Sequence, residues 1–354
     1  MPQHTPHCFR IVRNEQKNLQ LPLVRAFAVR MLAQGEAGRG FGVTFSMSRA
    51  IVFAYHNVGY RCLSVLLAHG VDVALVVTHR DNPKETIWFD SVAELAELHG
   101  IPVITPDNPN TPEVVEQIRA LQPDFFFSFY YREMLKRELL EIPKRGALNM
   151  HGSLLPKYRG RVPVNWAIIH GETETGATLH YMTEKPDNGD IVAQQAVPIL
   201  PDDTAFEVFQ KVAVAAEIAL NGVLPALLSG KAQAVKQDLS KGAYFGGRKA
   251  EDGIIDWLQS AQAIHNLVRA VASPYPGATT QLLGKNMRIL QTLVTGCEVS
   301  GENPAFYVKD GKAYAICGQG VLRVLRFELD GAEMSAAEFA ARHGMQRFEF
   351  NLAG

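Results

Sequence analysis

Cysteine is scarce in this sequence, and the few cysteines are scattered. The chain has 354 residues and four cysteines, Cys8, Cys62, Cys297 and Cys317, with no Cys-x-x-Cys pair among them. Cysteines spaced in this way indicate neither a disulfide framework nor a set of zinc ligands. We therefore expect reduced thiols that pack in apolar surroundings, in a cytoplasmic protein.

A surplus of either charge is also missing. The chain has 35 lysines and arginines against 36 aspartates and glutamates, for a formal net charge of -1. Such a chain carries no field that would attract nucleic acid or an anionic membrane. No run approaches the roughly 20 apolar residues that a membrane-spanning helix needs. These absences argue against a nucleic-acid partner and against membrane insertion.

The sequence does contain apolar runs that alternate with helical patterns. Runs typical of buried strands occupy residues 50–55, 71–78, 101–104 and 124–129, and helical stretches separate them at 58–69, 90–99 and 111–121. This alternation predicts an α/β fold with a doubly wound, parallel sheet. Two further strands are expected at 176–183 and 191–199, followed by a long helix at 202–228.

One signature of dinucleotide-binding folds is absent from its usual place. The first strand-to-helix turn reads Tyr55-His-Asn-Val-Gly59, whereas a dinucleotide-binding turn reads G-x-G-x-x-G. Only Gly59 would let a phosphate approach the backbone closely. A nicotinamide-dependent dehydrogenase is therefore the least favoured enzyme class.

Short strand patterns replace the longer alternation toward the C-terminus. A helix is expected at 261–271, and strands follow it at 278–283, 287–293, 305–308, 312–317 and 321–329. Strands of this length and spacing are typical of a small barrel or sandwich. We therefore expect three parts, namely an extension over residues 1–46, a catalytic domain over 47–247 and a smaller β domain over 248–354.

Residues 1–46 differ in character from the rest of the chain. Basic residues outnumber acidic ones there, and no strand pattern occurs. Arg25 and Arg30 interrupt its apolar run, so the segment does not match a secretory signal. We expect a poorly ordered extension without catalytic residues, and a membrane-touching or partner-binding helix is the alternative.

The stretch from Ala147 to Arg161 begins as a short apolar run and ends as a basic loop with glycine and proline. Because side chains alternate along a strand, Asn149 and His151 would share one face just before the strand ends at Gly152. Ligands bind at this edge of open α/β sheets. Taken alone, such a pair is more often a set of satisfied polar groups at a strand end.

The segment Asp187-Asn-Gly189 also has two interpretations. Asp, Asn and Gly are common turn residues, and a turn without chemistry is the commoner case. Alternatively, Asp187 supplies a carboxylate to a site that includes His151. The two residues lie far apart along the chain, and spacing cannot show whether they meet.

Taken together, these motifs indicate a protein family. Asn149-x-His151-x-Ser-Leu-Leu-Pro, Arg159-Gly160 and Asp187-x-Gly-x-Ile191 resemble the signature of the folate-dependent formyltransferases, which include methionyl-tRNA formyltransferase and the sugar N-formyltransferases. The resemblance covers residues 48 to about 280 and weakens after about 290. It is strongest to the subfamily formed by the formyltransferase half of bifunctional polymyxin-resistance enzymes.

The resemblance implies a Rossmann-like formyltransferase domain followed by an OB-like barrel. It implies 10-formyltetrahydrofolate as co-substrate, no metal, and a catalytic triad of Asn149, His151 and Asp187. The first two would donate hydrogen bonds to the formyl oxygen, and Asp187 would accept a proton from the attacking amine. Arg161 matches an arginine that contacts the sugar nucleotide. The segments that match the folate pocket contain Glu133, Met134, Leu135, Thr183, Glu184, Lys185, Pro186 and Asp187.

Several substrates are compatible with this family. The subfamily resemblance favours the 4-amino group of UDP-4-amino-4-deoxy-L-arabinose, in the lipid A modification that gives polymyxin resistance. A dTDP-4-amino-4,6-dideoxyhexose is the alternative, and methionyl-tRNA is disfavoured because the chain is near neutral. A folate- or nucleotide-binding module without catalysis is the non-enzyme alternative, and a homodimer is left open.

Overall fold

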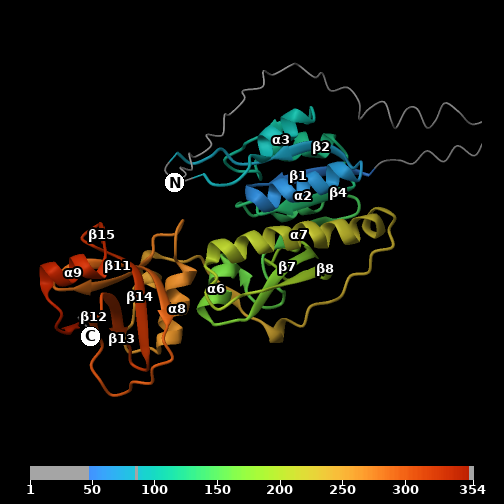
Figure 1. The fold of residues 1–354 in the computed structure, drawn as a ribbon. Coiled ribbons are helices and arrows are strands. Elements are labelled where there is room, and N and C mark those ends of the chain that lie inside the picture. Colours follow the sequence, from blue (N-terminus) through green and yellow to red (C-terminus); the bar gives the residue numbers. More distant parts are fainter. Residues whose placement is uncertain (1–47, 84–86, 351–354) are drawn as a thin grey trace, which may run out of the picture. The chain divides into compact units, whose positions relative to one another are not determined.

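The computed structural model describes residues 48–83 and 87–350, so the expectations for residues 1–46 lie outside it. The first sheet of this part has seven strands in the order β3-β2-β1-β4-β5-β7-β8 (Figure 1). β1 to β5 run parallel, whereas β7 and β8 are antiparallel to their neighbours. The mostly parallel sheet is therefore confirmed. Its strands are β1 (Arg49–Ala54), β2 (Asp72–Val77), β3 (Val103–Ile104), β4 (Phe125–Phe129), β5 (Ala147–His151), β7 (Glu174–Tyr181) and β8 (Ile191–Pro198).

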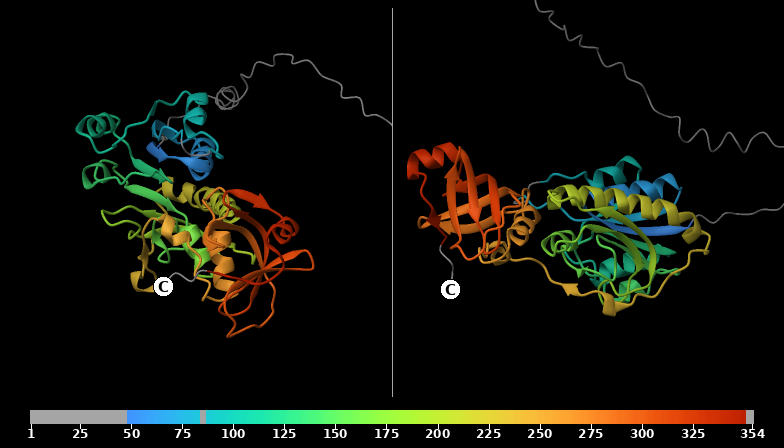
Figure 2. Two further views of the ribbon diagram at one scale, coloured as in Figure 1. Left: turned by 90° about the vertical axis from the view of Figure 1, so that its left-hand side faces the viewer. Right: turned by 60° about the horizontal axis from the view of Figure 1, so that its bottom comes forward.

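Helices cover both faces of this sheet, and each face has its own apolar core. One core joins the strands to α2, α3, α6 and α7, and the other joins them to α4 and α5. Figure 2 shows the long α7 lying across the strands. Because the strand order reverses between β1 and β4, the carboxyl ends of the central strands form the edge where ligands bind in such folds. The helices are α2 (His56–Ala68), α3 (Val92–Leu98), α4 (Pro112–Ala120), α5 (Arg137–Leu140), α6 (Pro163–Ile169) and α7 (Ala205–Leu228).

α7 corrects an expectation drawn from composition. By length and composition alone, this helix of 24 residues is apolar enough to cross a membrane, although the sequence analysis found no such run. In the structure its apolar residues pack onto β7, β8 and α2. A helix that packs on a protein core passes the same test of length and composition, and α7 packs on the core with one of its faces.

The C-terminal part has an antiparallel sheet with a separate apolar core. Its strands follow the order β10-β11-β14-β13-β12-β16, with β15 paired to β14. A small β domain is therefore present, while its OB-like closure and the boundary at residue 247 stay predictions. The elements are α8 (Ala261–Ala270), β10 (Ala278–Leu282), β11 (Lys285–Val294), β12 (Ala305–Lys309), β13 (Lys312–Ile316), β14 (Val321–Leu329), β15 (Ala332–Met334), α9 (Ala336–His343) and β16 (Phe348–Glu349).

The three cysteines in the described part of the chain are free thiols. Cys62 and Cys317 are buried, as expected, and burial raises the pKa of both, to about 12 for Cys317. Cys297 is exposed, because it lies in the loop between β11 and β12 and not on a core-facing strand position. The expectation that the thiols pack in apolar surroundings is wrong for this residue.

Candidate active site

Two adjacent strands place polar side chains at one edge of the first sheet. β5 carries Asn149 and His151, and antiparallel β7 sets His180 directly opposite Asn149. Facing residues of an antiparallel pair project to the same side of a sheet, so the three side chains lie together. His151 and His180 are buried, whereas Asn149 is partly exposed and accessible to a ligand.

Asp187 reaches this edge from the turn between β7 and β8. Its backbone is left-handed, with φ of 56°. A Cβ on Gly189 would stand 1.9 Å from the Tyr181 carbonyl oxygen, so only glycine lets the turn fold closely against β7. Gln237 holds the turn from outside, because its Nε2 donates to the carbonyl oxygens of Asp187 (2.9 Å) and Gly189 (2.6 Å). The turn is thus a firm support for one carboxylate.

The Asp187 carboxylate lies between two imidazoles and a backbone N–H. Its Oδ1 is 3.5 Å from His151 Nδ1 and 3.4 Å from His180 Nε2, and its Oδ2 accepts a hydrogen bond from Gly160 N at 2.7 Å. Burial raises the pKa of Asp187, but the neighbouring imidazole of His151 and the Gly160 N–H outweigh it and hold the pKa well below its ordinary value. Asp187 is therefore ionised at neutral pH, and a carboxylate in this form can accept a proton. The structure brings the three residues of the expected triad together.

Both ring nitrogens of His151 already have neighbours within the protein. Nε2 lies 2.8 Å from the Tyr158 carbonyl oxygen, and Nδ1 faces Asp187. A carbonyl and a carboxylate only accept hydrogen bonds, so the ring serves both only when both nitrogens carry hydrogens. This differs from the expected donation by His151 to a formyl oxygen, because a ligand would have to share or displace the Tyr158 contact. Asn149 is the freer of the two expected donors.

A short two-stranded sheet supplies the Gly160 N–H to Asp187. β6 (Arg159–Gly160) pairs in parallel with β9 (Tyr244–Phe245), which comes from a distant part of the chain. A Cβ on Gly160 would lie 2.2 Å from the Phe245 carbonyl oxygen, so this close approach requires glycine. Gly160 in the Arg-Gly motif therefore has a structural role, because it allows one backbone N–H to reach the Asp187 carboxylate.

The residues expected to line the folate pocket lie on two segments that approach each other. An ion pair of 3.6 Å between Arg137 Nε and Glu184 Oε1 joins the first segment to the second. Asn110 anchors the first segment, because its Nδ2 donates to the Met134 carbonyl oxygen (2.9 Å) and its Oδ1 accepts from Lys136 N (2.7 Å). Leu135 is buried and Pro186 is half-buried, whereas exposed side chains belong to Glu133, Met134, Thr183, Glu184 and Lys185.

His79 supports the start of the first folate segment. Its Nε2 accepts a hydrogen bond from Arg132 N at 3.0 Å, and its ring stacks on Tyr131 with centroids 4.2 Å apart. Burial and the nearby Arg132 charge lower the pKa of His79 to about 4. The neutral ring required by this hydrogen bond is therefore the form present at neutral pH.

The lowered pKa of His79 makes the stability of the fold depend on pH. The stabilisation is fully present above the unfolded pKa of about 6.5 and is lost as the pH falls toward 4. We expect His79→Gln to reduce the difference in the free energy of unfolding between pH 7 and pH 5. Urea unfolding at pH 7 and pH 5 measures this difference in the free energy of unfolding. Replacement of the exposed His99, His99→Gln, is the control. An unchanged difference in the His79 variant would contradict the assigned cause.

Arg161, the expected sugar-nucleotide residue, is exposed just before α6. Its backbone N–H donates to the Phe245 carbonyl oxygen at 2.9 Å, and a Cβ on Gly247 would lie 3.2 Å from its Nη1. Its guanidinium thus rests against Gly247, and no residue at positions 48–83 or 87–350 forms a hydrogen bond or ion pair with it. Its donors remain available to an anion such as a pyrophosphate.

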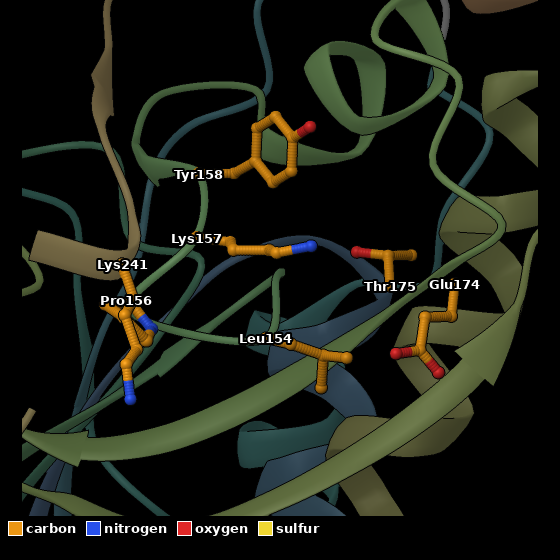
Figure 3. Close-up of a pocket in the computed structure, with 7 residues that line it drawn as sticks. All are labelled: Leu154, Pro156, Lys157, Tyr158, Glu174, Thr175 and Lys241. Carbon is orange, nitrogen blue, oxygen red and sulfur yellow. The ribbon is translucent and has the colours of Figure 1, made fainter. Parts of the chain in front are cut away.

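A cavity of about 250 Å³ lies beside the loop that follows β5. Figure 3 shows the Lys157 ammonium directed toward the Thr175 hydroxyl in this cavity. Lys157 pairs with Glu172 at 3.1 Å, and Lys241 lies 3.5 Å from Asp238, so acids balance both lysines. The cavity contains no triad residue. Its lining is Leu154, Pro156, Lys157, Tyr158, Glu174, Thr175 and Lys241.

Two residues of the site could not be identified from the sequence. His180 is on the predicted strand 176–183, and only the register of β7 against β5 reveals that it faces Asn149. Gln237 lies in a polar segment after α7 that has no recognisable motif. Within the described part of the chain, no group of three or more His, Cys, Asp or Glu residues is arranged to hold a metal ion.

Two models of known protein families match this chain. Residues 61–224 match the family model described as "Formyl transferase", and residues 248–344 match the model described as "Formyl transferase, C-terminal domain". The two matches together span well over half of the chain. They include Asn149, His151 and Asp187 in the first and all of α8 to β15 in the second.

Solved structures show the same fold. The N-formyltransferase from Helicobacter canadensis, in complex with folinic acid and dTDP-3-aminofucose, has 21% sequence identity and a TM-score of 0.61, with 78% of this chain and 99% of that chain covered. The sugar 3N-formyltransferase WlaRD, with dTDP and 5-N-formyl-THF, has 20% identity and a TM-score of 0.60, with coverage of 78% and 97%. A 4-N formyltransferase from Francisella tularensis has 21% identity and a TM-score of 0.54, with coverage of 66% and 92%.

Proposed function

This chain belongs to the formyltransferase family and is a folate-dependent enzyme, and we propose that it formylates the 4-amino group of UDP-4-amino-4-deoxy-L-arabinose. The co-substrate would be 10-formyltetrahydrofolate, which supplies an activated formyl group. The observation that carries the proposal is the meeting of Asn149, His151 and Asp187 at the carboxyl end of β5. In this proposal the enzyme serves lipid A modification in the cytoplasm, without binding nucleic acid or inserting into a membrane.

The arrangement of the three residues suits transfer of a formyl group to an amine. Asn149 is partly exposed, and its amide donates to the formyl oxygen, where negative charge develops as the amine attacks. Asp187 accepts the proton that the amine loses, and the pair with His151 (3.5 Å) holds the carboxylate in place. The proton then returns to the folate nitrogen that leaves, so no proton is consumed overall.

The folate segments give the co-substrate a place beside this group. Thr183, Glu184 and Lys185 are exposed and lead directly into Asp187. The Arg137–Glu184 pair brings the segment that contains Met134 to the same side. A folate bound along these two segments would reach the carboxylate with its formyl end. This placement is the part of the proposal that a bound structure would test.

The sugar is the least constrained part of the proposal. The motifs at residues 78–83 and 171–176 resemble the subfamily that acts on UDP-4-amino-4-deoxy-L-arabinose. The solved relatives favour a second candidate, because two of them were crystallised with dTDP or dTDP-3-aminofucose. A dTDP-linked amino sugar is therefore the alternative substrate, and both candidates share a nucleoside diphosphate and a primary amine.

A panel of acceptors tests the proposed function. The purified full chain receives 10-formyltetrahydrofolate and, separately, UDP-4-amino-4-deoxy-L-arabinose, dTDP-linked 3-amino and 4-amino sugars, and methionyl-tRNA. Mass spectrometry then detects the addition of one formyl group. We expect the UDP sugar to be formylated with the highest kcat/KM. Formylation of a dTDP sugar alone would favour the alternative, and formylation of methionyl-tRNA alone would overturn the proposal.

Arg161 should determine the affinity for the sugar nucleotide. We expect Arg161→Ala to raise KM for this substrate about tenfold, the effect of losing roughly 1.4 kcal/mol of charge-assisted contact, with little change in kcat. Steady-state kinetics with saturating formyl donor measures the effect. The exposed Arg342 on α9 offers a matched control, Arg342→Ala. An unaltered KM in the Arg161 variant would remove this residue from the substrate site.

A further inference from the structure

We propose that His180 is a positioning residue for formyl transfer, which holds the Asn149 amide so that one of its N–H groups faces the formyl oxygen. The inference rests on the proposed function and adds a fourth residue to it. His180 belongs to none of the motifs that carry the family resemblance. Its role follows from the register of β7 against β5 and from the neighbours of its two ring nitrogens.

The Nδ1 atom of His180 is engaged away from the site. It lies 2.8 Å from the Tyr181 carbonyl oxygen, and a carbonyl only accepts, so Nδ1 carries a hydrogen. Only 1% of the residue is exposed, so water does not compete for the ring. The proton on Nδ1 leaves Nε2 of a neutral ring with a lone pair, which makes Nε2 an acceptor.

Two groups compete for this one nitrogen. Nε2 is 3.2 Å from Asn149 Nδ2 and 3.4 Å from Asp187 Oδ1. A neutral ring accepts from the Asn149 amide, whereas a protonated ring would donate to Asp187 and lose that amide. His151 already faces Asp187 with one ring nitrogen and a carbonyl with the other. Asp187 therefore does not depend on His180 for a partner, and the neutral ring, which accepts from Asn149, fits the arrangement.

The contact determines the orientation of Asn149. An amide nitrogen has two hydrogens, and one of them is used toward His180 Nε2. The second remains for a ligand, and the amide oxygen is directed away from the imidazole. Without His180 the amide could rotate and present its oxygen, an acceptor, to the developing negative charge. His180 therefore acts through Asn149 and does not itself need to touch the substrate.

Two substitutions separate this role from simple packing. In His180→Gln the amide oxygen of the new side chain can occupy the position of Nε2 and accept from Asn149. In His180→Asn the shorter side chain can keep the contact to the Tyr181 carbonyl oxygen but offers no acceptor to Asn149. We expect the Gln variant to keep kcat within about threefold of wild type. We expect the Asn variant to lose between tenfold and 100-fold in kcat with little change in KM, part of the effect of a lost oxyanion donor.

A double-mutant cycle with Asn149→Ala tests whether His180 acts through Asn149. If it does, His180→Asn should cause no further loss in the Asn149→Ala background, because effects within one unit are not additive. Losses that multiply would show that His180 acts independently, and equal activity of the Asn variant and wild type would overturn the inference. These kinetic results require an active enzyme. Wild type that formylates no amino-sugar nucleotide would refute the proposed function instead.

The proton position on His180 gives a readout that does not depend on activity. Nitrogen-15 NMR of histidine-labelled full-length protein distinguishes a protonated from an unprotonated ring nitrogen. We expect Nδ1 of His180 to be protonated and Nε2 to be unprotonated, with an Nε2 resonance that shifts in Asn149→Ala. A proton on Nε2 at neutral pH, or a resonance that Asn149→Ala leaves unchanged, would contradict the inference whatever the substrate proves to be.

Discussion

Replacement of His151 by alanine is expected to lower kcat of formyl transfer by about 1,000-fold, because the proton acceptor Asp187 loses the imidazole that holds it. The substitution removes the partner of the Asp187 carboxylate at 3.5 Å and the group bound to the Tyr158 carbonyl oxygen. Asp187 would then lose the imidazole that helps to orient its carboxylate and would keep only the Gly160 N–H as a donor to Oδ2. Single-turnover assays with 10-formyltetrahydrofolate and the preferred amino-sugar nucleotide measure the chemical step directly.

The control for this variant must separate chemistry from folding. His99→Ala changes an exposed histidine after α3 and should leave kcat unchanged. The His151 variant should still bind 5-formyltetrahydrofolate with an affinity near that of wild type. A kcat within about tenfold of wild type, far less than the loss expected when the proton acceptor is no longer held in place, would show that His151 is not part of the catalytic group.

Replacement of Asp187 by asparagine is expected to lower kcat by between 100-fold and 10,000-fold. The amide has nearly the same shape, and its oxygen can still accept from Gly160 N, which Asp187 Oδ2 now does at 2.7 Å. It has no basic group, however, and cannot take the proton of the attacking amine. The turn held by Gln237 should keep its conformation, so KM should change little.

Asp190 offers a neighbouring control for Asp187. It is exposed at the end of the same turn, and Asp190→Asn should keep full activity. If Asp187→Asn retained more than about a tenth of wild-type kcat, another group would have to accept the proton. A loss confined to KM would instead make Asp187 a binding residue.

The elements of the fold could be predicted where the chain alternates regularly. The five parallel strands and α2, α3, α4 and α7 occur within a few residues of their expected positions. α6 was missed because its seven residues form one apolar run, Pro163-Val-Asn-Trp-Ala-Ile-Ile169, which is too short to show a helical period. Its start is also unusual, since Val162 before it has a left-handed backbone with φ of 49°.

The site could be predicted only in part for a similar reason. The shared face of Asn149 and His151 follows from the period of a strand, and that information is local. The approach of Asp187 depends on a turn after β7, and its support by Gln237 and the β6–β9 pairing depends on residues far along the chain. Family resemblance supplied Asp187, but it did not supply His180, whose place depends on strand register.

A structure of the enzyme with 10-formyltetrahydrofolate bound, in the absence of an amine acceptor, is the most direct test of the central claim. The formyl oxygen should lie about 2.7–3.1 Å from Asn149 Nδ2, with the formyl carbon beside the Asp187 carboxylate and the folate along the segments that contain Met134 and Lys185. A folate bound elsewhere, or one whose formyl group points away from Asn149 and Asp187, would contradict the claim that these residues form the transfer site.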